Sequence, residues 1–339
     1  MLEITATNAI DYLRRQGWIG DGPAHAEELS GGVSNLVLRI TTPERLFVLK
    51  QSRPQLRTRD AWFSDLDRIE REREVMQALH PLLPDVVPEV LFADRANYVY
   101  TMSHAPLDSQ VWKAQLLAGS FDLDLASRVG RVLGRIHQGA ADHSEHFAAY
   151  RDHNVYVQLR VDPFYRRVQE RRPEFAAAIE PIVTQMLTLK ESLCHGDYTP
   201  KNMLIRSFPS PSGRGGEGQG FTLVDYETAH FGDPTMDLGL FLTHLTLKAV
   251  RAPEHRDTIV SLMRRFWQAY AAEVTFRTPA ELEHRGVKHY GVCLLARVDG
   301  TSPVDYLFEE AKREHVRRIA RAILLDDVAT WESVWSNIL

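Results

Sequence analysis

Three short polar segments between residues 193 and 238 each adjoin a strongly apolar run, and their order constrains the fold more than any other feature. The first reads His-Gly-Asp-Tyr-Thr-Pro-Lys-Asn from His195 to Asn202 and leads into the strand-like run 203–205. The second, Val-Asp-Tyr-Glu, places Asp225 at the end of an apolar strand. The third, Gly-Asp-Pro-Thr-Met-Asp-Leu, opens a long apolar helix. This strand–loop–strand–helix order predicts that distant polar groups gather at one site.

Asp197, Asn202 and Asp225 have the residue types and spacing that phosphoryl transfer requires. In the catalytic loop of protein kinases, H-R-D-x-x-x-x-N, the Asp accepts the hydroxyl proton and the Asn binds Mg²⁺. The Asp-to-Asn spacing is the same here. Mg²⁺ prefers oxygen ligands, so we predict Asp197, Asn202 and Asp225 as catalytic residues and Asn202 and Asp225 as metal ligands. Glu227 faces the same side of an extended backbone as Asp225 and is predicted to join the metal shell.

The segments HGDYTPKN, VDYE and GDPTMDLG, in this order, resemble the aminoglycoside phosphotransferase and choline kinase family. That family also includes methylthioribose kinases and homoserine kinase-like enzymes. The resemblance covers roughly residues 29–270. It implies an α+β, protein-kinase-like fold with a small β-rich N-lobe, a large helical C-lobe and ATP between them. It also implies that His195 is structural, and we expect Asp237 to brace the catalytic loop through backbone hydrogen bonds.

The resemblance further implies a strand lysine that contacts the α- and β-phosphates, and Lys50 ends the strand 46–49. Its predicted partner is Glu72, which falls on the apolar face of the next helix and is costly there unless paired. Glu74 is the alternative, since the helix phase can slip by one residue. Additional nucleotide contacts are predicted in the glycine-bearing turn before the hairpin and at the hinge: Gly31, Gly32, Ser34, Asn35 and Met102.

Apolar periodicity supports the same α+β plan. The first hundred residues are mainly strands with one crossing helix, whose alternating charges from Arg68 to Glu74 are interpreted mostly as a solvated face. We predict an N-lobe at 1–102, a C-lobe at 103–339 and a flexible Ser/Pro/Gly-rich insertion at 207–220. Strands are predicted at 36–40, 46–50, 90–92, 98–102, 203–205 and 221–224. Helices are predicted at 9–18, 59–79, 123–137, 175–189, 236–250, 257–274 and 311–325.

Composition limits the partners. A formal net charge of -5 provides no basic surface for nucleic acid. No apolar stretch is long enough to span a bilayer, and the N-terminus lacks the pattern of a secretory signal. Two cysteines without metal-ligand spacing are expected to be reduced thiols. We therefore expect a cytoplasmic protein, monomer or homodimer, whose partner is a small-molecule hydroxyl acceptor.

The predicted function is transfer of the γ-phosphate of ATP, with Mg²⁺, to a hydroxyl of a sugar, aminoglycoside or amino alcohol. A protein kinase is less favoured because Asp225 is followed within a few residues by Gly232-Asp233-Pro234, with no room for an activation segment. A catalytically silent nucleotide-binding module is also less favoured, because Lys50 and all three predicted catalytic residues are present. The acceptor site, or merely a helix–helix connection, is predicted at 296–306, with further lining candidates Asp152, Asn154, Arg160 and Asp162.

Overall fold

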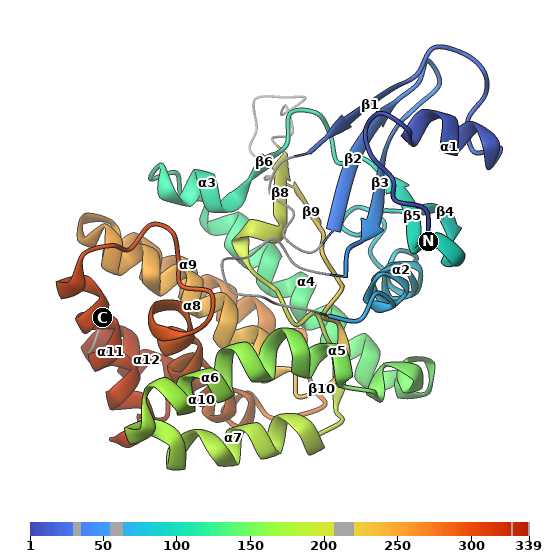
Figure 1. Ribbon diagram of the computed structural model, residues 1–339. Helices are drawn as coiled ribbons and strands as arrows, with labels where there is room; N and C mark the ends of the chain where they lie inside the picture. The colour runs from blue at the N-terminus through green and yellow to red at the C-terminus, as the bar shows by residue number, and fades with distance from the viewer. Residues whose placement is uncertain (30–34, 55–63, 207–219, 327, 338–339) are drawn as a thin grey trace. The chain divides into compact units, whose positions relative to one another are not determined.

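The computed structural model describes residues 1–29, 35–54, 64–206, 220–326 and 328–337 (Figure 1). It divides into two compact units, Met1–Ser109 with Phe221–Glu227, and Gln110–Gly220 with Thr228–Leu339. Three residues predicted to contact nucleotide, Gly31, Gly32 and Ser34, lie outside the described residues, as does nearly all of the predicted insertion. Among the described residues, no helix combines the length and apolar character that a membrane crossing requires.

The first unit is built on an antiparallel sheet in the order β1-β2-β3-β5-β4. Its strands are β1 (His25–Glu28), β2 (Asn35–Thr41), β3 (Leu46–Ser52), β4 (Val90–Asp94) and β5 (Val99–Ser103). The helices of this unit are α1 (Ala9–Arg15) and α2 (Arg68–Leu79). The unit also contains the short turn η1 (Arg95–Asn97) and the strand β9 (Gly220–Leu223), which leads to Asp225.

Alternation along the β2–β3 hairpin sends apolar side chains to one face and functional ones to the other. Leu38 and Leu49, which pair across the hairpin, pack with Tyr12 and Leu13 of α1 in one buried cluster. Lys50 follows Leu49 and therefore faces the opposite side, where it meets α2. The sheet thus uses one face for its core and the other to hold a buried charge.

The charged run from Arg68 to Glu74 is not the mostly solvated helix face that its alternating charges predicted. Arg68, Glu70 and Glu72 are buried, and none of the seven residues is fully exposed. The charges are buried because they pair with groups from other segments, which sign alternation alone does not reveal. The helix also begins at Arg68 rather than near residue 59; residues 55–63 lie outside the described part of the chain.

The second unit is mainly helical. Its long helices are α4 (Leu123–Asp142), α7 (Ala176–Thr188), α8 (Thr235–Arg251), α9 (Arg256–Ala271), α10 (Pro279–Asp299) and α11 (Glu310–Leu325). Shorter helices are α3 (Trp112–Leu117), α5 (Asn154–Tyr156), α6 (Arg167–Arg171) and α12 (Trp331–Asn337). The remaining turns are η2 (Ser144–Arg151), the π-helical η3 (Val157–Arg166), η4 (Pro173–Phe175), η5 (Pro200–Asn202) and η6 (Pro253–His255). Its short strands are β6 (Gln110–Val111), β7 (Ser192–Cys194), β8 (Met203–Arg206) and β10 (His230–Gly232).

Helix α8 is the centre of the second unit, buried along its whole length from Thr235 to Val250. Its buried residues therefore cover all sides of the helix and are not confined to the single apolar stripe of a surface helix. It crosses α10 closely at Gly239, where an added Cβ would lie 2.6 Å from the backbone nitrogen of Tyr290. This packing fixes the start of α8, which carries the third polar segment of the sequence.

Several predicted boundaries require correction. Helix α4 continues to Asp142 rather than ending at 137, and α9 ends at Ala271 rather than at 274. Residues 296–299, predicted as part of a turn-rich connection, form the last turn of α10, because the helix continues through them to Gly300. The strands β1, β6, β7 and β10 and the helix α10 were not predicted.

Candidate active site

The loop that carries Asp197 follows β7 and is anchored by the antiparallel pairing of β7 with β10, in which Cys194 faces His230. Gly196 has a φ of +74°, and a Cβ there would lie 2.5 Å from the carbonyl oxygen of Thr228. Only glycine fits this left-handed turn without displacing the neighbouring backbone. The glycine of the H-G-D segment therefore sets the direction in which Asp197 leaves the strand.

Asp237 clamps this loop from the first turn of α8, as predicted. Its carboxylate accepts hydrogen bonds from the backbone N–H groups of His195 (2.7 Å) and Gly196 (2.8 Å). Burial alone raises the pKa of Asp237, but the hydrogen bond and charge of His137 and those of His195 outweigh it, so the pKa lies below its ordinary value. His195 in turn accepts a hydrogen bond from the N–H of Asp197 at Nδ1 (3.1 Å), which suits a structural role.

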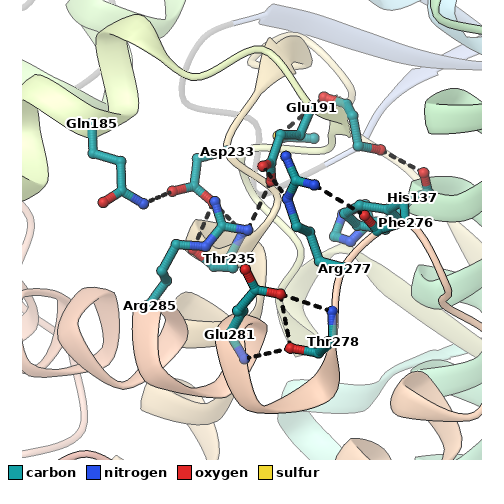
Figure 2. A network of polar contacts seen from close by, with 12 residues as sticks. His137, Gln185, Glu191, Asp233, Thr235, Phe276, Arg277, Thr278, Glu281 and Arg285 are labelled. Atoms are coloured by element: carbon teal, nitrogen blue, oxygen red, sulfur yellow. Dashed lines mark hydrogen bonds and ion pairs between the residues drawn. The ribbon is translucent and has the colours of Figure 1, made fainter.

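A second network fixes the start of α8, on which Asp237 depends (Figure 2). Asp233 accepts hydrogen bonds from the backbone N–H and the hydroxyl of Thr235, at 3.0 and 2.7 Å, and from the side chain of Gln185 at 2.8 Å. Arg285 lies 3.5 Å from Asp233 and also pairs with Glu191 at 2.7 Å. The G-D-P-T segment is thereby held at both ends of its turn.

Asp197 is buried, and basic and amide groups surround its carboxylate. Oδ1 lies 3.0 Å from Arg160, and Oδ2 lies 2.8 Å from the amine of Lys201. The side-chain amide of Asn202 donates to Oδ2 and to the backbone oxygen of Asp197, both at 2.9 Å. Burial alone raises the pKa of Asp197, but Arg160 and Lys201 outweigh it and hold the pKa well below the usual range. Asp197 is therefore a carboxylate throughout the neutral range.

The first unit assembles the other predicted groups around Lys50. Its amine lies 2.7 Å from the carboxylate of Glu72 and 3.5 Å from Asp225. The predicted pair of Lys50 with Glu72 is thus present, whereas Glu74 pairs with Arg73 at the edge of the helix. Glu72 also accepts a hydrogen bond from the backbone N–H of Tyr226 (3.2 Å), so one buried carboxylate positions both the lysine and the segment after β9.

Glu227, predicted as a metal ligand, is held by groups that the sequence reading did not assign to it. Its Oε2 accepts hydrogen bonds from Nε of Arg68 at 3.2 Å and from the side-chain amide of Asn35 at 2.9 Å. Asn35, predicted to contact nucleotide, therefore lies beside the predicted metal ligands. Met102 lies on β5 between β3 and β4, opposite Val48. The nucleotide and metal roles of these residues remain predictions.

Asp225 has backbone and charge surroundings that suit a metal ligand. Its φ of +73° is left-handed, a conformation in which Asp is among the few tolerated side chains. Burial raises the pKa of Glu72 to about 7; Lys50 opposes this shift, and Asp225 and Glu227 add to it. Among the residues that the structure describes, the ion pairs of these three carboxylates are with two cations, Lys50 and Arg68. The excess negative charge and the oxygen donors of this cluster fit a divalent cation.

Two contacts of Asp197 were missed by sequence reasoning. Arg160 was predicted only as a general lining candidate, and it reaches Asp197 from η3, a π-helical run interrupted by Pro163. Lys201 was given no role, although it stands four residues after Asp197 in the same loop. That short spacing was the available signal for Lys201, whereas nothing in the sequence pointed from Arg160 to the loop.

The comparisons with known proteins point to one family. Residues 25–277 match the model of a family described as the phosphotransferase enzyme family. Methylthioribose kinases from Exiguobacterium sibiricum and Pectobacterium carotovorum are each 23% identical to this chain; the alignments cover 82% and 79% of it and 75% and 74% of the relatives. Among solved structures, a choline kinase from Cryptosporidium parvum has a TM-score of 0.60 at 10% identity, covering 98% of this chain and 100% of that one. A Ralstonia eutropha protein assigned to the aminoglycoside phosphotransferases has a TM-score of 0.53 at 17% identity, covering 97% of each chain.

The structure combines a small antiparallel sheet region with a large helical part, and the family match and the named relatives are those of a small-molecule kinase. Because the family model spans most of its length, the chain belongs to the phosphotransferase enzyme family. The resemblance to aminoglycoside phosphotransferases and choline kinases and the predicted protein-kinase-like α+β fold are thereby confirmed.

Proposed function

We propose that the protein transfers the γ-phosphoryl group of ATP to a hydroxyl of a small molecule. The observation that carries this proposal is the carboxylate of Asp197, kept ionised by Arg160 and Lys201 on a loop that Asp237 clamps. Phosphoryl transfer needs an oriented acceptor oxygen and neutralised phosphate charge more than it needs covalent help from the protein. A rigid carboxylate with a low pKa suits the first requirement.

In the proposed reaction the acceptor oxygen forms a bond to the γ-phosphorus while the bond from that phosphorus to the β,γ-bridging oxygen breaks. ADP leaves, and the hydroxyl proton passes to Asp197 and then to solvent. Because its pKa is low, Asp197 orients the hydroxyl and receives the proton late in the transfer. Lys50, positioned by Glu72, would bind the α- and β-phosphates.

Asp225 and Asn202 would hold Mg²⁺, and Glu227 is the further candidate ligand. When bound, the ion neutralises charge on the phosphates. The side chain of Asn202 supports this assignment, because its NH₂ group is already used by Asp197, which leaves the carbonyl oxygen to face a cation.

The acceptor is proposed to be a sugar, aminoglycoside or amino-alcohol hydroxyl. The named relatives act on methylthioribose, which is a sugar derivative, and the fold is shared with a choline kinase. The expectation of a cytoplasmic monomer or homodimer rests on composition and stays a prediction.

A screen of ADP release tests this function. Purified protein is incubated with ATP and Mg²⁺ and with sugars, sugar acids, amino alcohols, nucleosides and aminoglycosides in turn. We expect ADP release that depends on one class of acceptor. Nucleotide binding without acceptor-dependent release across the whole panel would instead indicate a catalytically silent nucleotide-binding module.

A further inference from the structure

A group of basic side chains lies beside Asp197 within the second unit. Arg160, which pairs with Asp197, has its guanidinium carbon 5.4 Å from the ring centroid of Phe164. The guanidinium carbon of Arg297, on α10, lies 5.9 Å from the same ring. Two arginines from separate segments therefore share one aromatic ring next to the proposed base, and Arg297 is close enough to Asp197 for their charges to interact.

Lys248 of α8 continues this group. Its amine and that of Lys113 each lie 5.4 Å from the ring centroid of Tyr306. The side chain of Lys248 is almost completely buried, and its amine donates a hydrogen bond to the backbone oxygen of His244, one turn earlier in the helix, at 2.9 Å. Lys113 and Arg297 lie close enough to Lys248 for their charges to interact with its amine.

The carboxylates near this group of basic side chains do not neutralise its positive charge. Asp197 is already taken by Arg160 and Lys201, and Asp305 pairs with Lys113 at 2.8 Å. Within the described part of the chain, Lys248 and Arg297 form no ion pair, and the buried Nε of Arg297 has no hydrogen-bond partner. Burying a cation without a counter-charge is costly, and an anion bound beside these groups would offset that cost.

Partial exposure makes the group accessible. Arg297, Lys113 and Tyr306 are only partly buried, whereas Lys248 is buried. The hydrogen bond from the N–H of Thr301 to the oxygen of Pro163 (3.4 Å) joins the segment after α10 to η3. The two regions predicted from sequence to line the acceptor site thus meet in this group.

We infer that the acceptor carries an anionic group, a carboxylate or a phosphate, which Lys248 and Arg297 bind while Asp197 faces its hydroxyl. This inference rests on the proposed phosphotransferase function and narrows its substrate class. Choline and aminoglycosides carry positive charge, and five basic side chains around Asp197 and Tyr306 repel them: Lys113, Arg160, Lys201, Lys248 and Arg297. Neutral sugars leave the two unpaired cations without a partner.

The burial of Lys248 supports the same inference. Burial and the charges of Lys113 and Arg297 lower the pKa of Lys248 to about 7, while Asp305 opposes the shift. An anion beside the amine favours its charged form, so binding of the acceptor and protonation of Lys248 reinforce each other.

The test compares matched acceptors that differ in charge: glucuronate, glucose and glucosamine, and ribose 5-phosphate with ribose. Phosphorylation is followed with Arg297→Gln, Lys248→Met and the control Arg321→Gln, an exposed arginine on α11. A charge-assisted hydrogen bond implies that each site variant raises KM for the anionic acceptor about ten- to a hundredfold. The KM for ATP should not change, and the control should behave as the wild type with every acceptor.

A folding readout and a binding readout accompany the kinetics. Lys248→Met keeps the length of the side chain and removes the buried charge, so its Tm should equal or exceed that of the wild type. If glucosamine or choline is phosphorylated in preference to the anionic members, the inference is wrong although the proposed function stands. Equal KM values in wild type and both variants contradict it as well. If no acceptor is phosphorylated, the proposed function fails, and thermal shift with glucuronate and ribose 5-phosphate then tests the inference. Stabilisation of the wild type but not of Arg297→Gln supports an anion site. No stabilisation of the wild type overturns the inference.

Discussion

At the scale of single residues, Asp197 combines burial with three donors, and this combination sets both its charge and its direction. Asp197→Asn keeps the shape of the side chain and removes the charge. We expect kcat to fall about 10²- to 10⁴-fold, the contribution typical of a positioned acid–base group. Nucleotide affinity should be little changed, since Lys50 belongs to a separate cluster. Asp124→Asn, an exposed position at the start of α4, is the matched control and should retain wild-type turnover.

Lys50 tests the nucleotide half of the site. Lys50→Met removes the amine that pairs with Glu72 and approaches Asp225. We expect ATP affinity or turnover to fall by orders of magnitude, because the phosphates lose their cation. Titration calorimetry with ATP and steady-state kinetics measure the two effects. If both stay at the wild-type level, Lys50 has no role in nucleotide binding.

Glu72 gives the protein a pH-dependent stability of predictable sign. Its pKa rises from 4.5 to about 7 on folding, chiefly through burial, with Asp225 and Glu227 adding to it and Lys50 opposing it. The folded state therefore binds more protons, so the contribution of Glu72 to stability is present below pH 4.5 and is lost as the pH rises towards 7.

Glu72→Gln, which mimics the protonated form, should remove this dependence. The measurement is the free energy of urea unfolding for wild type and variant at a series of pH values. The difference between them should change over this range and level off above it. A constant difference would show that the pKa of Glu72 is not raised.

At the scale of elements, α4 packs against α9 with a close backbone approach at Gly130. A Cβ at Gly130 would lie 2.1 Å from the carbonyl oxygen of Phe266, a backbone atom that cannot move alone. We expect Gly130→Ala to destabilise the fold by about 1–3 kcal/mol or more, as overpacking does. Gly139→Ala on the same helix meets nothing within 4 Å and should be neutral or stabilising by about 0.5–1 kcal/mol. Thermal denaturation compares the two; equal Tm values would contradict the close crossing.

Sequence periodicity predicted the elements that are long and regular, such as α8 and the β2–β3 hairpin. It missed α10, which contains Gly286 and Gly291, because glycine is unfavourable in the interior of a helix. Both glycines are required by packing, because added Cβ atoms would meet Trp331 and Ile323, respectively, at 2.8 and 2.9 Å. The strands β7 and β10 have three residues each, too few for an alternation to be detected.

The candidate site was predictable where a motif carries it. The H-G-D and V-D segments, and the lysine that ends β3, pointed to their residues directly. Arg68 and Arg160 were not assigned because their partners, Glu227 and Asp197, stand 159 and 37 residues away in the chain. Contacts of this kind depend on how helices pack, and neither local propensity nor charge pattern contains that information.

At the scale of the whole molecule, the residues proposed to act in the reaction are divided between the two units. The first carries Lys50, Glu72 and Asp225, and the second carries Asp197, Asn202 and the basic group proposed to bind an anionic acceptor. Each set of contacts is complete within its own unit. We propose that both sets act on the same ATP molecule in one reaction.

Transfer of labelled phosphate tests that claim most directly. With ATP labelled at the γ-position, Mg²⁺ and the acceptor found by the screen, a phosphate ester of the acceptor is identified by ³¹P NMR. We predict a labelled ester with the wild type and its loss in both Asp197→Asn and Lys50→Met. Ester formation by either variant at the wild-type rate, or an ester that lacks the label, would contradict the account.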